Sequence, residues 1–237
     1  HHMTIQAAID AANPGETILV NNGTYNENVI VNKRLNIIGW DKDTTSIDGG
    51  GVENAVNITA DWVNITGLTV MNGSTAYPYA SIMVYYADNC LIYDVNATGS
   101  RYGVNFWYSN YGTLRDSILS YNPTTGCFYQ LATYLAISNN TVEYNGISGI
   151  HGSWGSNLTI SGNHIDQTGN YGIYFNLGGA YSIVENNYIS GAAVEGIHLR
   201  NMPASPTGNC YIANNTICDN VYGMYICLLY TSPSPRD

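Results

Sequence analysis

The sequence has few basic residues and no long apolar segment. Seven Lys and Arg residues stand against seventeen Asp and Glu residues, which gives a formal net charge of −10. This balance disfavours binding to nucleic acid, because nucleic-acid affinity depends on cationic contacts to phosphate. No apolar run approaches the roughly 20 residues of a membrane-spanning helix, and no signal peptide is recognisable. We therefore expect neither a nucleic-acid partner nor membrane insertion.

Cysteine and acidic residues also lack the spacing of a metal site. The five cysteines follow no paired pattern, so free thiols are favoured over a disulfide framework or a metal centre, with Cys127 at an inward position. Asp41, Asp43 and Asp48 could hold calcium, but the chemistry of tight turns explains these residues equally well. We expect no cofactor, with calcium as the one candidate.

Glycine, by contrast, recurs at nearly constant intervals. Successive members are separated by 23, 23, 23, 24 and 27 residues. A fixed period in the low twenties without helical heptads indicates a solenoid rather than a globular domain. A β-sandwich also has many short strands, but it needs no residue column at constant period. The periodic glycines are Gly103, Gly126, Gly149, Gly172, Gly196 and Gly223.

A second column, of asparagine, follows the same period and lies three residues after an aliphatic residue in each block. Apolar residues at alternate positions predict short strands with one buried face, and about 23 residues is enough for three strands and three turns. One block is therefore one coil of a parallel β-helix. Because coils stack at about 4.8 Å, the asparagines should form a buried ladder of side-chain amides. Its members are Asn140, Asn163, Asn187 and Asn215.

The two ends of the chain differ from the repeats. Residues 4–13 predict an amphipathic capping helix with Thr4 as N-cap, and Pro14-Gly15 ends it. Residues 1–3 look like a tag remnant. Residues 228–237 depart from the repeat and are interpreted as a non-native or disordered tail. We expect an all-β solenoid domain over residues 4–227 with about nine to ten coils. We also expect it to be truncated at the C-terminal side, so that the full-length protein has further domains.

The segment Thr4-Ile-Gln-Ala-Ala-Ile-Asp-Ala-Ala-Asn-Pro-Gly-Glu-Thr-Ile-Leu-Val, with Asn22-Gly-Thr-Tyr-Asn-Glu-Asn-Val and Leu35-Asn-Ile-Ile-Gly, resembles the opening of pectin-lyase-like right-handed parallel β-helix proteins. Within that superfamily the chain is most similar to the NosD-like and carbohydrate-binding or sugar-hydrolase group. The resemblance covers Thr4 to about Ile226 and implies the right-handed winding. Members include lyases, hydrolases, epimerases and surface proteins, so the resemblance specifies function weakly.

Function must then come from the outward face of the coils. Residues one and three after each periodic glycine are mostly apolar and are expected to point inward, whereas residues two and four should face solvent. The outward set forms a strip of aromatic and polar side chains about 24 Å long. Pyranose rings stack on aromatic faces while their hydroxyls take hydrogen bonds. Cross-strand stacking that merely stabilises the sheet is the alternative. The predicted carbohydrate-binding residues are Trp107, Phe128, Gln130, Tyr174, Asn176 and Tyr225.

Catalysis is the alternative function, as a polysaccharide lyase or glycoside hydrolase. Hydrolysis uses two carboxyl groups about 5 to 10 Å apart, yet Glu195 is the one acid on the strip. Asp94 and Asp116 occupy equivalent positions in adjacent coils and form a second candidate pair, although solvated turn acids explain them as well. The residues to consider for catalysis are His151, His198, Glu195 and Arg200.

A copper-related periplasmic role, suggested by the NosD-like resemblance, is less favoured. His151 and His198 lie two coils apart, which is too far for two parallel imidazoles to share one ion easily. Eight Asn-x-Ser/Thr sequons, including Asn139 and Asn214 beside the ladder, are compatible with an extracellular or cell-surface location. We therefore expect a secreted or surface scaffold that binds a polysaccharide or surface glycan, or mediates adhesion.

Overall fold

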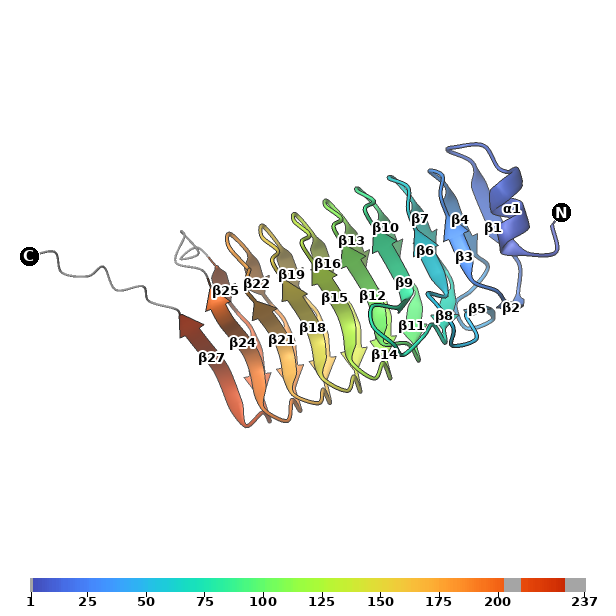
Figure 1. Cartoon of the computed structure of the whole chain (residues 1–237). Helices are drawn as coiled ribbons and strands as arrows, with labels where there is room; N and C mark the ends of the chain where they lie inside the picture. The colour runs from blue at the N-terminus through green and yellow to red at the C-terminus, as the bar shows by residue number, and fades with distance from the viewer. Residues whose placement is uncertain (1, 203–209, 229–237) are drawn as a thin grey trace, which may run out of the picture.

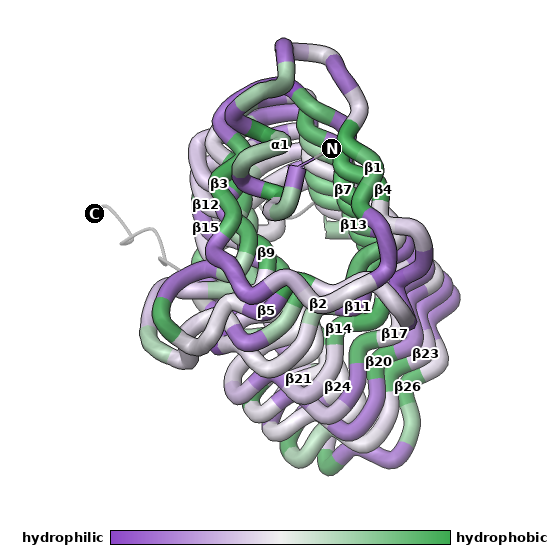
Figure 2. The backbone as a smooth tube through the Cα atoms, turned by 90° about the vertical axis from the view of Figure 1, so that its right-hand side faces the viewer, coloured by the Kyte–Doolittle hydropathy of each residue, from purple (hydrophilic) through white to green (hydrophobic). Residues whose placement is uncertain are grey.

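Three parallel sheets of nine strands each wind around a common axis, so that the chain forms a right-handed parallel β-helix of nine coils (Figure 1). The computed structural model describes residues 2–202 and 210–228. Figure 2 looks along this axis and shows the three sheets enclosing the interior. The predicted all-β solenoid, its nine to ten coils and its winding are thereby confirmed.

Each coil contributes one strand to each sheet. Sheet 1 consists of β1 (Thr17–Val20), β4 (Asn36–Gly39), β7 (Asn64–Thr66), β10 (Leu91–Tyr93), β13 (Thr113–Arg115), β16 (Ala136–Ser138), β19 (Thr159–Ser161), β22 (Ile183–Glu185) and β25 (Tyr211–Ala213). Sheet 2 consists of β2 (Gly23–Asn26), β5 (Thr45–Asp48), β8 (Thr69–Met71), β11 (Asn96–Thr98), β14 (Ile118–Ser120), β17 (Thr141–Glu143), β20 (His164–Asp166), β23 (Tyr188–Ser190) and β26 (Thr216–Cys218). Sheet 3 consists of β3 (Val29–Val31), β6 (Val56–Ile58), β9 (Ala80–Tyr85), β12 (Tyr102–Trp107), β15 (Thr125–Gln130), β18 (Ser148–Ser153), β21 (Tyr171–Asn176), β24 (Glu195–Met202) and β27 (Tyr222–Leu228).

The interior is built from aliphatic residues that stack in register from coil to coil. In sheet 1, Leu114, Ile137, Ile160 and Val184 follow one another along the axis, and each is fully buried. Alternation of such residues with polar ones gives every strand one buried face, and burial of that face is the main stabilising contribution. Cys127 is fully buried within this core, and all five cysteines are free, as expected.

The predicted asparagine ladder runs along the corner between sheets 1 and 2. Asn140, Asn163 and Asn187 are each 1 % exposed, and the side-chain amide of each donates to the side-chain oxygen of the next member at 2.9 Å. The final acceptor is Asn215. Each side-chain oxygen also accepts from the preceding member's backbone N–H. The ladder therefore satisfies buried backbone groups that a turn would otherwise leave without partners.

A second ladder, which the sequence analysis missed, lies at the corner between sheets 2 and 3. Asn122 and Asn145 are each 1 % exposed, and Asn122 Nδ2 donates to Asn145 Oδ1 at 3.1 Å. Asn220 has the same role in the last coil, where its Oδ1 accepts from the N–H of Ala192. Thr168 and Ala192 interrupt the asparagine pattern in between, which hides this column in the sequence.

Tyrosines occupy many of the tight corner positions that require a positive φ. Tyr111 and Tyr134 have φ of 55° and 56°, and their rings stack at 4.9 Å. Tyr121 and Tyr144 likewise stack at 5.1 Å. Such coil-to-coil stacking offsets the cost of a left-handed backbone at a residue other than glycine. The high tyrosine content therefore reflects corner packing to a large extent rather than the outward strip alone.

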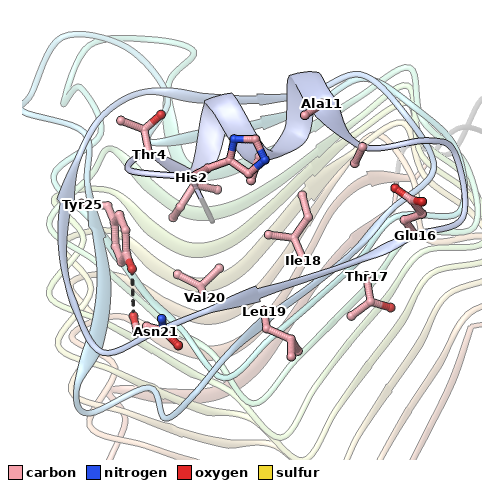
Figure 3. A pocket seen from close by; sticks show the side chains of 13 residues that line it. His2, Thr4, Ala11, Glu16, Thr17, Ile18, Leu19, Val20, Asn21 and Tyr25 are labelled. Atoms are coloured by element: carbon pink, nitrogen blue, oxygen red, sulfur yellow. Dashed lines mark hydrogen bonds between the residues drawn. The ribbon is translucent and has the colours of Figure 1, made fainter.

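The N-terminal helix α1 (Ile5–Ala11) begins at the predicted N-cap, because Thr4 Oγ1 accepts from the N–H of Ala7. The Glu27 carboxylate accepts from the first helical N–H groups, and Lys33 Nζ donates to carbonyls at the helix end. Gln6 bonds both backbone groups of Ile30 and so covers the free edge of β3. Between α1 and β1 the first coil remains hollow, with a cavity of about 310 Å³ (Figure 3). The cap thus covers sheet 3 rather than the whole first coil.

The C-terminal boundary differs slightly from the expected one. Leu228 belongs to the backbone of β27, whereas the rest of the predicted tail, 229–237, lies outside the described residues. Within the described residues no helix is long and apolar enough to cross a membrane.

Candidate functional site

The outer face of sheet 3 carries three parallel columns of side chains. Its strands are six residues or longer from β9 to β27, whereas those of sheets 1 and 2 have three or four residues. The longer strands leave room for an initial, a central and a final outward position in each coil. The central column contains Asn105, Phe128, His151, Tyr174, His198 and Tyr225 in register.

The rings of the central column contact one another in tilted or edge-to-face arrangements and are thereby largely buried. Successive ring centroids from Phe128 to Tyr225 are 5.1, 4.5, 4.9 and 5.1 Å apart. Phe128 is 6 % exposed, Tyr174 8 % and His198 8 %, whereas Tyr225 in the last coil is 47 % exposed. The prediction that this column faces outward is correct, but the prediction that Phe128, Tyr174 and His198 are solvent-exposed is wrong. The spacing between strands brings the rings of neighbouring coils into contact, and that contact excludes water.

The final outward position is more accessible and forms what we call the outer row. It consists of side chains that neighbour one another through the strand register, and all are half-buried or exposed. Trp107, Gln130 and Asn176, which the sequence analysis assigned to carbohydrate binding, belong to this row. Six members at about 4.8 Å per coil span about 24 Å. The outer row is Tyr85, Trp107, Gln130, Ser153, Asn176 and Arg200.

A second row, the corner row, borders the outer row from Tyr85 to Asn176. Its members directly follow β9, β12, β15, β18 and β21, and all take a positive φ. Tyr86 and Tyr108 stack at 4.6 Å, and Trp154 is 52 % exposed. The sequence analysis missed this row, because its residue types change from coil to coil. It consists of Tyr86, Tyr108, Leu131, Trp154 and Leu177.

One carboxylate and one imidazole form a buried pair on this face. Glu195 begins β24 and its Oε2 hydrogen-bonds Nδ1 of His198, three residues on, with both side chains at or below 10 % exposure. The His198 Nε2 atom is buried without a partner among the described residues. The Tyr171 ring lies 5.0 Å from that of His198, and Arg200 Nη1 donates to the Tyr174 hydroxyl at 3.5 Å. The fold therefore brings together three of the four predicted catalytic candidates.

The fourth candidate, His151, lies two coils away from His198 with Tyr174 between them. Burial lowers the pKa of His151 to about 4, because a charged imidazole would be poorly solvated there. Its imidazole is neutral at neutral pH. Its ring is 4.5 Å from Tyr174, so His151 extends the central column rather than joining the Glu195–His198 pair.

An eight-residue connection between β8 and β9, residues 72–79, stands at one end of this face (Figure 1). Pro78 O accepts from the Asn105 amide, and the Tyr77 ring lies 5.5 Å from Trp107. The Arg101 guanidinium lies over both the Tyr77 and Tyr102 rings, at 5.6 and 5.5 Å. The loop places the exposed Tyr77 ring at the Trp107 end of the outer row, and Arg101, which precedes β12, adds a cation there.

Most of the acids proposed outside this face bond or pair with other residues. Asp94 and Asp116 lie at equivalent corners of adjacent coils, but Asp94 pairs with Lys42 and Asp116 with Arg115. Asp41 accepts from the N–H of Asp43, while Asp48 accepts from the N–H of Gly50 and from the Asn72 amide. In the part of the chain that the structure describes, no three His, Cys, Asp or Glu side chains converge as metal ligands would.

The coil geometry agrees with a family assignment. Residues 54–217, more than half of the chain, match the model of the right-handed β-helix region, so the chain belongs to this family. The structural resemblance to pectin-lyase-like proteins expected from the N-terminal segment is likewise shown. A search among curated proteins finds no match to the chain.

Solved structures resemble the chain in fold at low sequence identity. The pectate lyase Pel9A matches with a TM-score of 0.70 at 14 % identity, covering 97 % of this chain and 72 % of that enzyme. An alginate lyase from Paenibacillus sp. str. FPU-7 matches with a TM-score of 0.63 at 15 % identity, covering 92 % and 94 %. The Dettilon tailspike protein matches at 0.62 and 16 % identity, and the chain spans about half of its length, with coverages of 88 % and 49 %. Similarity at this level defines the fold alone.

Proposed function

We propose that the protein binds an extended carbohydrate chain along the outer row of sheet 3. The observation that carries the proposal is the in-register line of half-buried or exposed aromatic, amide and guanidinium side chains, bordered by the corner row. Tyr85 and Trp107 supply ring surface, and Gln130, Asn176 and Arg200 supply hydrogen-bond donors and acceptors. This combination suits a pyranose chain, whose C–H faces are apolar and whose hydroxyls need directional partners.

The local charge of this face differs from that of the whole chain. Arg101 and Arg200 flank the two ends of the site, and the one carboxylate among its described outward residues, Glu195, is bonded to His198. The net negative charge of the chain would repel a polyanion, but the local charge of this face is not acidic and would not repel one. The site is therefore open to neutral glycans and to uronates, and both belong in a binding test.

The test uses tryptophans inside the proposed site and a matched tryptophan outside it. Trp154 in the corner row and Trp62 near sheet 1 have the same φ of 60° and exposures of 52 % and 55 %. A glycan array with neutral and uronate oligosaccharides identifies the ligand, and calorimetry then measures it. Trp107→Ala and Trp154→Ala should each weaken binding by about 1–3 kcal/mol, as for other central aromatic contacts. Trp62→Ala is the control, and equal losses in all three variants would place the site elsewhere.

Tyr174 and Phe128 remain proposed members of the site, although their burial changes how they act. Because both are below 10 % exposed, we propose that they position the strand and offer ring edges rather than free faces. Substitution of either residue would also lower stability, so neither is a clean test of binding.

Catalysis is the second candidate function, favoured by the Glu195–His198 pair. An imidazole that donates from Nδ1 to a carboxylate carries its lone pair on Nε2 and can act as a base there. Because His198 Nε2 is buried, a substrate would reach it only after neighbouring rings, such as that of Tyr225, move aside. With a single carboxylate on the face, β-elimination from a uronate is better supported than hydrolysis. His198 Nε2 would take the proton beside the uronate carboxylate, the C–O bond would break to leave a C=C bond, and the Tyr174 hydroxyl would protonate the leaving oxygen.

The two functions are separated by product analysis. Uronate polymers incubated with the protein should yield an unsaturated product that absorbs in the ultraviolet if elimination occurs. His198→Ala and Glu195→Gln should then abolish turnover, whereas His164→Ala, which alters an exposed ring stacked on Tyr188, should not. Binding without any product supports the scaffold alone. We further propose an extracellular or cell-surface location, since polymeric glycans are encountered there.

A further inference from the structure

A groove outside sheet 3 lies on the corner between sheets 1 and 2, near the N-terminal end. Its volume is about 440 Å³, which falls within the ~300–1,000 Å³ range of ligand pockets. Three successive coils line it, through the corners that follow β4, β7 and β10. The sequence analysis treated the acids of this region as a calcium candidate and as part of an acid pair, and the proposed function uses none of them.

The groove is hollow because the middle coil has no side chain at its corner. Gly67 has a φ of 68°, and a Cβ atom there would lie 2.5 Å from Gly39 O. A Cβ on Gly39 would lie 2.0 Å from Gly67 O. The two glycines therefore allow adjacent backbones to approach closely. They leave a floor of main-chain atoms below the level of the neighbouring corners.

Two aromatic residues line the groove from the coils on either side. Trp40 is 77 % exposed, and Tyr93 is half-buried with the Arg115 guanidinium 4.6 Å above its ring. The two residues belong to coils two steps apart, so their backbones are about 10 Å apart along the axis. Because the Arg115 guanidinium covers one face of Tyr93, Trp40 offers the more accessible ring. An exposed tryptophan held in a turn offers a large contact area at little entropic cost.

The polar groups of the groove make it acidic. Lys42 crosses the middle coil to pair with Asp94, so these two charges neutralise each other. Asp41 and Asp43 remain as carboxylates, and Asp41 Oδ1 accepts from the N–H of Asp43. The Asp43 carboxylate makes no hydrogen bond or ion pair within the described residues, and it lies at the exposed lip of the groove.

We propose that this groove binds a saccharide unit that carries a free amino group, as in an unacetylated hexosamine. The C–H face of the ring packs on Trp40, and the ammonium group meets the Asp41 and Asp43 carboxylates. An ammonium near an indole face gains a further cation–π attraction. The site is separate from the outer row, so the protein has two binding surfaces with different charge preferences.

The test measures binding of a glucosamine tetramer to the whole chain by calorimetry at low salt. Trp40→Ala should weaken binding at least tenfold, and Asp43→Asn should weaken it about fivefold without altering the turn. Two matched controls carry the same chemical changes elsewhere. They are Trp62→Ala, and Asp219→Asn at an exposed corner where φ is 55°. Both controls should leave the affinity unchanged, as should Trp107→Ala in the outer row.

Further ligands decide which part of the proposal holds. The N-acetylated tetramer should bind at least fivefold more weakly, and an equal or tighter affinity overturns the requirement for an amino group. Spermidine supplies ammonium groups without a sugar ring, and an affinity equal to that of the tetramer overturns the saccharide. No detectable tetramer binding, or equal losses in Trp40→Ala and Trp62→Ala, overturns the site itself. Loss of tetramer binding in Trp107→Ala, with Trp40→Ala unaffected, would place the tetramer on sheet 3 and would likewise overturn the groove.

Discussion

Replacement of Asn163 by leucine tests the asparagine ladder at its centre. The Asn163 side chain takes part in five hydrogen bonds: Nδ2 donates to Ile137 O, Ser161 O and Asn187 Oδ1, and Oδ1 accepts from the N–H and the amide of Asn140. Leucine has a similar volume and none of these groups. The substitution leaves the Asn140 N–H without an acceptor and removes a donor from the Ile137 carbonyl. Because Asn163 is 1 % exposed, water cannot replace these partners.

Each buried polar group left without a partner costs roughly 1–3 kcal/mol, so these two groups amount to about 2–6 kcal/mol. For a chain of this length, 1 kcal/mol lowers the melting temperature by roughly 2–4 °C. Asn163→Leu should therefore lower it by about 10 °C in a thermal scan followed by circular dichroism. Asn170→Leu is the control, because Asn170 is exposed in the same coil. A loss no larger than that of the control would refute the argument that the ladder stabilises the corner.

Two more predictions concern residues of β18. His151→Phe should remove an acid sensitivity: burial lowers the pKa of His151 to about 4, against about 6.5 when unfolded, so its contribution is complete above pH 6.5 and declines by about 3 kcal/mol as pH falls towards 4. Urea unfolding at pH 7 and 4.5 should show a smaller pH effect in the variant, and equal effects would contradict the assignment. Gly152→Ala places a Cβ 1.6 Å from Tyr129 Cζ and should cost about 1–3 kcal/mol. Tyr129→Leu in the same chain should recover part of that loss, and strict additivity would show that the two do not clash.

The fold was predictable from the sequence because stacking repeats the same demand in every coil. The positions of Asn140, Asn163 and Asn187 each need a buried amide, so one residue type recurs at the coil period. The second ladder escaped notice because Thr168 and Ala192 occupy two of its positions. A corner can thus keep its geometry while its residue types change. A search for one recurring residue type then fails to detect the corner.

The candidate site was predictable in position but not in exposure. Alternation after each periodic glycine placed Phe128, Tyr174 and His198 correctly on the outer face of sheet 3. It could not show that their rings touch, since contact depends on the spacing between strands and on each ring's rotamer. The corner row was also hidden, because a positive φ at Leu131 or Trp154 is not what those residue types favour.

The two ladders also limit how the length of this protein can change. A deletion of one whole coil, such as residues 126–148, joins equivalent positions of β15 and β18 and keeps Asn163 in line with the corner between sheets 1 and 2, whereas a deletion of one residue more or fewer puts inward side chains outside. Changes in length are therefore tolerated in steps of one coil. Each step lengthens or shortens the outer row by one side chain and about 4.8 Å. The length of the binding surface along a glycan can therefore change only in steps of one coil, and the number of coils that the gene encodes sets it.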